Sequence, residues 1–166
     1  NRIIGMGGAL DSSRFKTYLS LALKKPACDI DGMVIGGHGD TTMIPLTRLA
    51  SYNGIPINQF LSKKILDEVS ASTMIGGATL TKLLGTSAWY APGASVSYLV
   101  DSILNNQKKI IPCSVMLDGE YGLRNICIGV PIIVGANGVE NIVEIDLNDI
   151  ENEKLQISSS TVNKMN

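Results

Sequence analysis

The sequence predicts one α+β domain over residues 1–166, built from antiparallel hairpins and long helices. Apolar residues recur at helical spacing over residues 9–24, 58–84 and 91–106. The last third is instead rich in β-forming residues, with turn sequences at 118–122 and 136–138. No long linker, internal repeat or low-complexity segment divides the chain. The helices and hairpins are therefore expected to share one compact domain.

The first predicted helix spans residues 9–24. Its apolar side chains recur at helical spacing, at Phe15, Leu19, Ala22 and Leu23. Pro26 then stops the helix. The apolar run at 32–35 predicts a short buried strand, which ends at a glycine-rich loop.

Two longer helical patterns follow this strand. Between the prolines at 45 and 56 we expect a short helix or irregular structure. The pattern over 58–84 is expected to be interrupted at Gly76-Gly77. Its candidate N-caps are Asn58 and Ser62. A further helix is predicted over 91–106.

The last third is predicted to form antiparallel strands and a closing helix. Strands are expected at 110–117, 125–129, 130–135 and 141–147. The turn sequences between them are typical of hairpins. Asn148 or Asp149 is expected to cap a final helix that ends near Lys164.

Composition excludes several classes of protein. Hydrophobic residues make up 45% of the chain and charged residues 17%, which excludes a disordered chain. The net charge is −1 and no basic stripe indicates nucleic-acid binding. The strictly apolar runs are too short to cross a bilayer, and no secretory signal is visible. The three cysteines form no CxxC motif, so we expect free thiols in the cytoplasm and no metal site.

The single histidine of the chain is the first candidate functional residue. His38 lies in Gly36-Gly37-His38-Gly39-Asp40, directly after the predicted strand. This placement predicts a side chain presented at a strand end, and an imidazole can exchange protons near neutral pH. Taken alone, a histidine in such a loop is more often a turn residue than a functional group.

Asp11 and Arg14 lie upstream in the first predicted helix, three residues apart and so on one face. One interpretation is a helix-terminal acid in an exposed ion pair that contributes little to stability. The other is catalytic. A carboxylate can fix the tautomer of His38, and a guanidinium can bind a substrate carboxylate through two parallel hydrogen bonds.

Several motifs occur in a fixed order along the chain. Leu10-Asp11-Ser12-Ser13-Arg14-Phe15 precedes the Gly-Gly-His-Gly-Asp loop. Further motifs lie at residues 85–92, 118–122, 129–131 and 135–140. Together they resemble the catalytic C-terminal half of the lactate/malate dehydrogenase family. The resemblance covers essentially the whole chain.

This resemblance implies a role for each residue of the constellation. His38 takes the place of the family's proton acceptor, and Asp11 that of the aspartate that orients it. Arg14 takes the place of the arginine that binds the C1 carboxylate of the substrate. The implied reaction is the reversible oxidation of a 2-hydroxy acid with NAD as hydride acceptor.

Four further positions are implied, with ordinary packing as an equal alternative for each. Met6 and Pro92 match positions near the cofactor in the family. Ser87 and Ala88 match the loop that lines its substrate pocket.

The resemblance favours malate and oxaloacetate over lactate and pyruvate as the substrate pair. Gly37 precedes the histidine where lactate dehydrogenases typically carry an acid. The pattern at 85–92 is similar to that of the bacterial lactate-dehydrogenase-like malate dehydrogenases. The arginine that usually decides specificity in the family has no counterpart in this sequence. Lactate or another 2-hydroxy acid therefore stays an alternative, as does NADP for NAD.

A complete dinucleotide fingerprint is missing from the sequence. Gly5-Met6-Gly7-Gly8 comes nearest to GxGxxG, but Leu10 occupies the third glycine position. We therefore expect the chain to be the C-terminal half of a longer enzyme, partnered by an N-terminal Rossmann domain. Alone, it is expected to bind NAD weakly and to show negligible malate oxidation. An uncovered apolar surface predicts association, as a dimer or tetramer.

Two functions of other classes fit the sequence less well. A non-catalytic oligomerisation module derived from the same fold would have no need of Asp11, Arg14 and His38 together. A nucleotide hydrolase would need a GK[ST] element in a glycine-rich loop, which the sequence does not contain.

Overall fold

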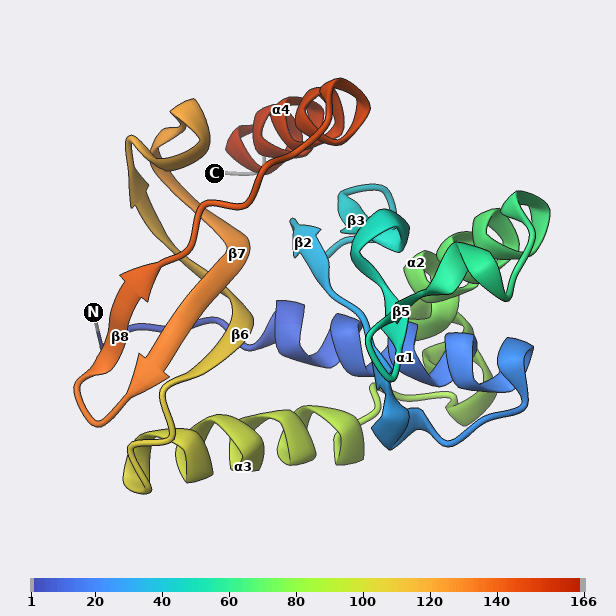
Figure 1. The fold of residues 1–166 in the computed structure, drawn as a ribbon. Helices are drawn as coiled ribbons and strands as arrows, with labels where there is room; N and C mark the ends of the chain where they lie inside the picture. The colour runs from blue at the N-terminus through green and yellow to red at the C-terminus, as the bar shows by residue number, and fades with distance from the viewer. Residues whose placement is uncertain (1, 165–166) are drawn as a thin grey trace.

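The computed structural model describes residues 2–164 and confirms the predicted α+β class (Figure 1). Its four α-helices are α1 Gly7–Leu23, α2 Lys63–Leu84, α3 Tyr90–Leu104 and α4 Asp149–Asn163. The strands of the main sheet are β2 Val34–Gly36, β3 Met43–Pro45, β6 Lys109–Asp118, β7 Arg124–Gly135 and β8 Gly138–Ile142. A smaller sheet contains β1 Ile30–Asp31, β4 Ser51–Tyr52 and β5 Ile55–Pro56.

The main sheet has the strand order β3-β2-β7-β6, and β8 also pairs with β7. Every pairing in it is antiparallel. The predicted strands at 125–129 and 130–135 are in fact one strand that continues through Pro131. Pro131 lies opposite Pro112 of β6. Two residues that face each other in an antiparallel ladder exchange either two backbone hydrogen bonds or none. Prolines have no N–H, so the facing prolines form a pair that exchanges none.

The strand predicted at 141–147 is also displaced. β8 ends at Ile142, and residues 143–148 are irregular. The Tyr121 hydroxyl donates a hydrogen bond to the Val143 carbonyl and accepts one from the Ile145 N–H. The Tyr121 side chain thus binds backbone groups that a neighbouring strand would otherwise bind, so the strand ends at this point.

The helices follow the predicted order with shifts at their ends. Ser62 caps α2, whereas Asn58 belongs to a short 3₁₀ turn that precedes it. Asn148 caps α4, and its side chain forms a capping box with Glu151. The expected interruption at Gly76-Gly77 is wrong, because α2 runs through both glycines. None of the helices among residues 2–164 is long and apolar enough to span a membrane.

Helix α1 lies between two groups of buried residues and carries two of the candidate residues, Asp11 and Arg14. One group fills the space around β6, β7, α3 and α4, and the other packs Phe15 and Leu19 of α1 against α2 and residues 30–61. The start of α1 is tied to β6, because Gly5 and Ser114 exchange two backbone hydrogen bonds of 2.8 Å. In Figure 1, α1 runs below β2 in the view, and the two elements are in contact. The Asp11–His38 contact joins α1 to the loop that follows β2.

Candidate active site

His38 lies in the loop between β2 and β3, as the sequence predicts. The loop is closed by Thr42, whose hydroxyl accepts a hydrogen bond of 2.9 Å from the Gly39 N–H. The Thr42 N–H also donates to the Gly39 carbonyl at 2.9 Å. Gly36, at the end of β2, has φ +90°, a conformation that favours glycine. The two bonds fix the backbone that follows the imidazole.

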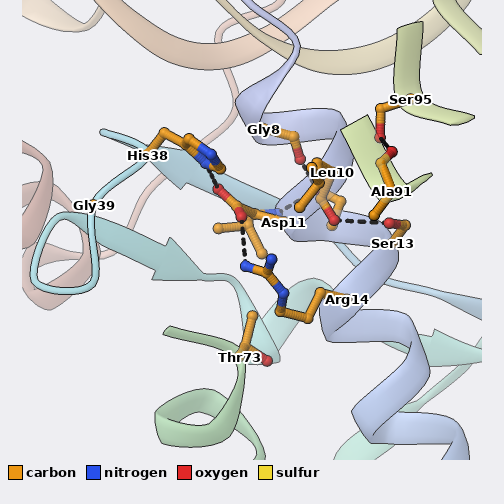
Figure 2. Close-up of polar contacts among 12 residues, drawn as sticks. Gly8, Leu10, Asp11, Ser13, Arg14, His38, Gly39, Thr73, Ala91 and Ser95 are labelled. Carbon is orange, nitrogen blue, oxygen red and sulfur yellow. Dashed lines mark hydrogen bonds and ion pairs between the residues drawn. The ribbon is translucent and has the colours of Figure 1, made fainter. Parts of the chain in front are cut away.

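Asp11 is the centre of the arrangement (Figure 2). Its Oδ2 lies 2.7 Å from Nδ1 of His38, and its Oδ1 accepts a hydrogen bond of 3.1 Å from Nη1 of Arg14. The Asp11 side chain is only 2% exposed. The alternative of an exposed ion pair at the helix terminus is therefore wrong. A buried carboxylate needs partners, and Asp11 has two cationic or donating groups.

The Asp11 carboxylate also determines the proton chemistry of His38. An ionised carboxylate only accepts hydrogen bonds, so Nδ1 carries the proton that lies between them. This assignment leaves Nε2 of the neutral imidazole able to accept a proton. The hydrogen bond that Nδ1 of His38 donates to Asp11 raises the pKa of His38, although partial burial of the ring opposes that rise. The His38 side chain remains 54% exposed, so a ligand can reach it.

Arg14 lies between α1 and α2 with its guanidinium turned toward Asp11. In Figure 2 it extends between Asp11 and Thr73 of α2. A Cβ atom at Gly76 would lie 2.7 Å from Cδ of Arg14, and one at Gly77 would lie 3.3 Å from Nη2. The two glycines therefore give the arginine its place against α2, and this contact explains why they occur inside a helix that does not break.

The glycines at the start of α1 have a structural explanation of the same kind. A Cβ atom at Gly7 would lie 2.7 Å from Cγ of His38, and one at Gly8 would lie 2.7 Å from the Pro112 carbonyl oxygen. These glycines allow α1 to pack closely on the imidazole and on β6. Gly7 and the pair Gly76-Gly77 were not predicted as site residues. The glycines themselves were a signal in the sequence, because glycine inside a helix is unfavourable unless close packing requires it.

The four other candidate residues lie at the start of α1, between α2 and α3, and at the start of α3. Met6 is the N-cap residue of α1, partly buried against the core of the main sheet. Ser87 and Ala88 lie between α2 and α3, with Ser87 exposed and Ala88 half-buried. Pro92 is half-buried in the first turn of α3. Their roles remain predictions.

Residues 8–165 match the family model described as lactate/malate dehydrogenase, alpha/beta C-terminal domain. The chain belongs to the lactate/malate dehydrogenase family. The motifs at Asp11, Arg14 and His38 thus lie within the matched part, and the α+β fold is the fold of this family's C-terminal domain.

Curated relatives in the lactate/malate dehydrogenase family match the chain from end to end. The malate dehydrogenase of Flavobacterium johnsoniae is 74% identical over 166 residues, which is 100% of this chain and 53% of the relative. That of Bacteroides fragilis is 65% identical over the same length and coverage. The chain therefore spans about half the length of these curated relatives.

Solved structures of the family have the same fold. The malate dehydrogenase of Cryptosporidium parvum matches 98% of the chain and 53% of its own length, with 36% identity and a TM-score of 0.95. The lactate dehydrogenase of Eimeria maxima, solved with NADH and oxamate, matches 98% of the chain and 52% of its own length. Its identity is 40% and its TM-score 0.94. Similar backbones therefore occur in enzymes named for either substrate.

Proposed function

We propose that this chain is the substrate-binding and proton-transferring domain of an NAD-dependent malate dehydrogenase. The reaction is the reversible oxidation of (S)-malate to oxaloacetate. The observation that carries the proposal is the buried Asp11 carboxylate, which contacts both His38 and Arg14. A histidine paired with a carboxylate is suited to acid–base catalysis, and an arginine at the same carboxylate is suited to hold an anionic substrate nearby.

Each residue of this group has one task in the proposed reaction. Arg14 binds the C1 carboxylate of malate and thereby holds the C2 hydroxyl at His38. Nε2 of His38 accepts the hydroxyl proton during oxidation and returns it during reduction. Asp11 keeps the Nδ1 proton in place and stabilises the imidazolium that forms. NAD, when bound, supplies the acceptor for the hydride that leaves C2.

The described residues fit only the nicotinamide end of NAD. Nδ1 of His38 is engaged with Asp11 while the side chain stays half exposed, so substrate and nicotinamide can share the open side of the ring. Met6 and Pro92 are the residues proposed to contact the nicotinamide. Residues 2–164 contain only antiparallel strand pairs, so no βαβ unit in this part can hold the pyrophosphate.

We assign the pyrophosphate to a Rossmann domain outside these 166 residues, with which residues 1–166 work as the catalytic domain. The greater length of the curated relatives supports this assignment.

Assembly into a homo-oligomer and a cytoplasmic location belong to the same proposal. Exposed apolar side chains on α2 and α3 support association: Ile75, Leu80, Leu83, Leu84, Val96, Val100 and Leu104.

Malate is the proposed substrate because the curated relatives that match from end to end are malate dehydrogenases. Ser87 and Ala88 are the residues proposed to line the pocket beside the substrate. Lactate is the alternative, supported by the similarity to solved lactate dehydrogenases. Comparing oxaloacetate with pyruvate as the substrate for NADH oxidation distinguishes the two.

The test of this function uses a hybrid enzyme. In it, the present chain replaces the matching residues of the Flavobacterium johnsoniae malate dehydrogenase, which is 74% identical to it. The hybrid carries His38→Asn, and NADH oxidation by oxaloacetate is followed by absorbance. We expect kcat to fall at least about a hundredfold, the usual contribution of a general acid or base. NADH binding, measured by fluorescence, should be retained.

The unsubstituted hybrid and the chain alone are the controls for this test. The hybrid should turn over, while the chain alone should give only the background rate. Turnover in the His38→Asn hybrid equal to that of the unsubstituted hybrid would remove the proposed role. A hybrid that folds and binds NADH but never turns over would favour the non-catalytic oligomerisation module.

A further inference from the structure

A side chain of the last helix enters the base of the loop that carries His38. Ser158 lies in α4 and is 2% exposed. Its hydroxyl donates a hydrogen bond of 2.8 Å to the Thr42 carbonyl and accepts one of 2.9 Å from the Gly37 N–H. These two backbone groups lie on opposite arms of the loop. One hydroxyl thus joins both arms of the loop to a helix more than a hundred residues away in sequence.

The Ser158 hydroxyl lies where the next residue pair of the β2–β3 ladder would form. Gly36 pairs with Met43 as the last rung of that ladder. Gly37 and Thr42 would form the next pair, but the Ser158 hydroxyl lies between their N–H and C=O groups. The two arms therefore separate at this point instead of pairing directly, and His38 follows immediately.

Close packing of α4 on the same backbone supports this arrangement. A Cβ atom at Gly36 would lie 3.1 Å from Oγ of Ser158, and one at Gly37 would lie 3.0 Å from Cγ2 of Val162. The start of the loop therefore has little space to move toward α4. The Ser158 hydroxyl and the packing of Val162 therefore act on the same residue, Gly37.

We propose that Ser158 is a positioning residue for His38, acting through the backbone of Gly37 and Thr42. Its hydroxyl sets the separation of the loop arms and so the distance between the imidazole and Asp11. Without it, Gly37 and Thr42 either pair directly or keep unpaired buried groups, and both outcomes displace the loop. The consequence for turnover rests on the proposed function of His38, whereas the consequence for the position of the imidazole does not.

The test is a nuclear magnetic resonance titration of the imidazole in the 166-residue chain, prepared without a histidine tag. His38 is the only histidine, so its ring resonances are unambiguous. In Ser158→Ala we expect the pKa of His38 to fall toward that of a free imidazole, because its bond to Asp11 weakens. The charged groups that face the ring are Asp11 and Arg14 of α1 and Asp40 of the loop, and the substitution leaves all three unchanged.

Ser159→Ala is the matched control. Ser159 is the next residue of α4 and is also buried, but its hydroxyl donates only to the Gln156 carbonyl of its own helix, at 2.9 Å. We expect this variant to keep the His38 pKa of the native chain. Equal pKa values for His38 in the native chain and in Ser158→Ala would overturn the proposal, as would equal falls in both variants.

Amide hydrogen exchange in the native chain gives an answer even if Ser158→Ala fails to fold. The Gly37 amide should exchange far more slowly than the amide of the exposed Asp40 in the same loop. Equal rates at the two positions would show that the hydroxyl does not hold the loop. Loss of turnover in the His38→Asn hybrid tests the proposed function separately, since neither measurement here depends on turnover.

Discussion

At the scale of single residues, the burial of Asp11 excludes a surface ion pair. An exposed Asp–Arg pair at this spacing would contribute little, because water screens it. Asp11 is instead enclosed, and one oxygen is bound to each of its two partners. The sequence motifs indicated all three residues as candidates. They could not predict the burial, because burial depends on β6 and α2 closing over the first turns of α1.

Asp11→Asn should lower the pKa of His38. In the native chain, the hydrogen bond that His38 donates to the Asp11 carboxylate is the main cause of the raised pKa of His38. An amide carries no charge to stabilise the imidazolium, so protonation becomes less favourable and the pKa falls. Titration of the single imidazole by nuclear magnetic resonance measures this directly. An unchanged or higher pKa in Asp11→Asn would show that the carboxylate does not act on the ring.

At the scale of elements, α1 and α2 together hold the guanidinium. The helical pattern of α2 was predicted correctly, but the role of Gly76-Gly77 was not. Glycine usually weakens a helix, which favoured an interruption. The structure shows the opposite outcome, because contact with Arg14 requires small residues on a continuous helix. A pattern within one helix carries no information about which side chain of another helix lies against it.

Gly76→Ala should therefore impair substrate binding more than stability. Alanine favours the helix by about 1 kcal/mol, but its Cβ would lie 2.7 Å from Cδ of Arg14 and must displace that side chain. In the hybrid enzyme we expect the KM for oxaloacetate to rise about tenfold, which corresponds to about 1.4 kcal/mol of lost binding.

Gly93→Ala on α3 is the control for the Gly76 substitution. A Cβ atom at Gly93 would meet no atom within 4 Å, so the helix should gain stability by about 0.5–1 kcal/mol without a clash. Thermal unfolding of both variants separates the effect on the helix from the effect on Arg14. A KM for oxaloacetate in Gly76→Ala equal to that of the unsubstituted hybrid would contradict the proposed role of the glycine pair.

At the scale of the whole molecule, the site depends on segments that are distant in sequence. Asp11 comes from the first helix, His38 from a hairpin loop, and Ser158 from the last helix. The ordered motifs were sufficient to predict the family and the α+β class. The boundaries of β7 and β8 were mispredicted, because they depend on the pairing of Pro131 with Pro112 and on the Tyr121 hydroxyl. Such contacts exist only in the assembled sheet.

The pH dependence of both reaction directions tests the central claim most directly. Oxidation of malate needs neutral His38 to accept a proton, and reduction of oxaloacetate needs protonated His38 to donate one. We therefore predict that, in the hybrid enzyme at saturating cofactor, kcat/KM for malate rises with pH through the raised pKa of His38. The value for oxaloacetate should fall over the same pH range. A change in the same sense for both substrates, or no change for either, would contradict the assignment of His38 as the proton-transferring group.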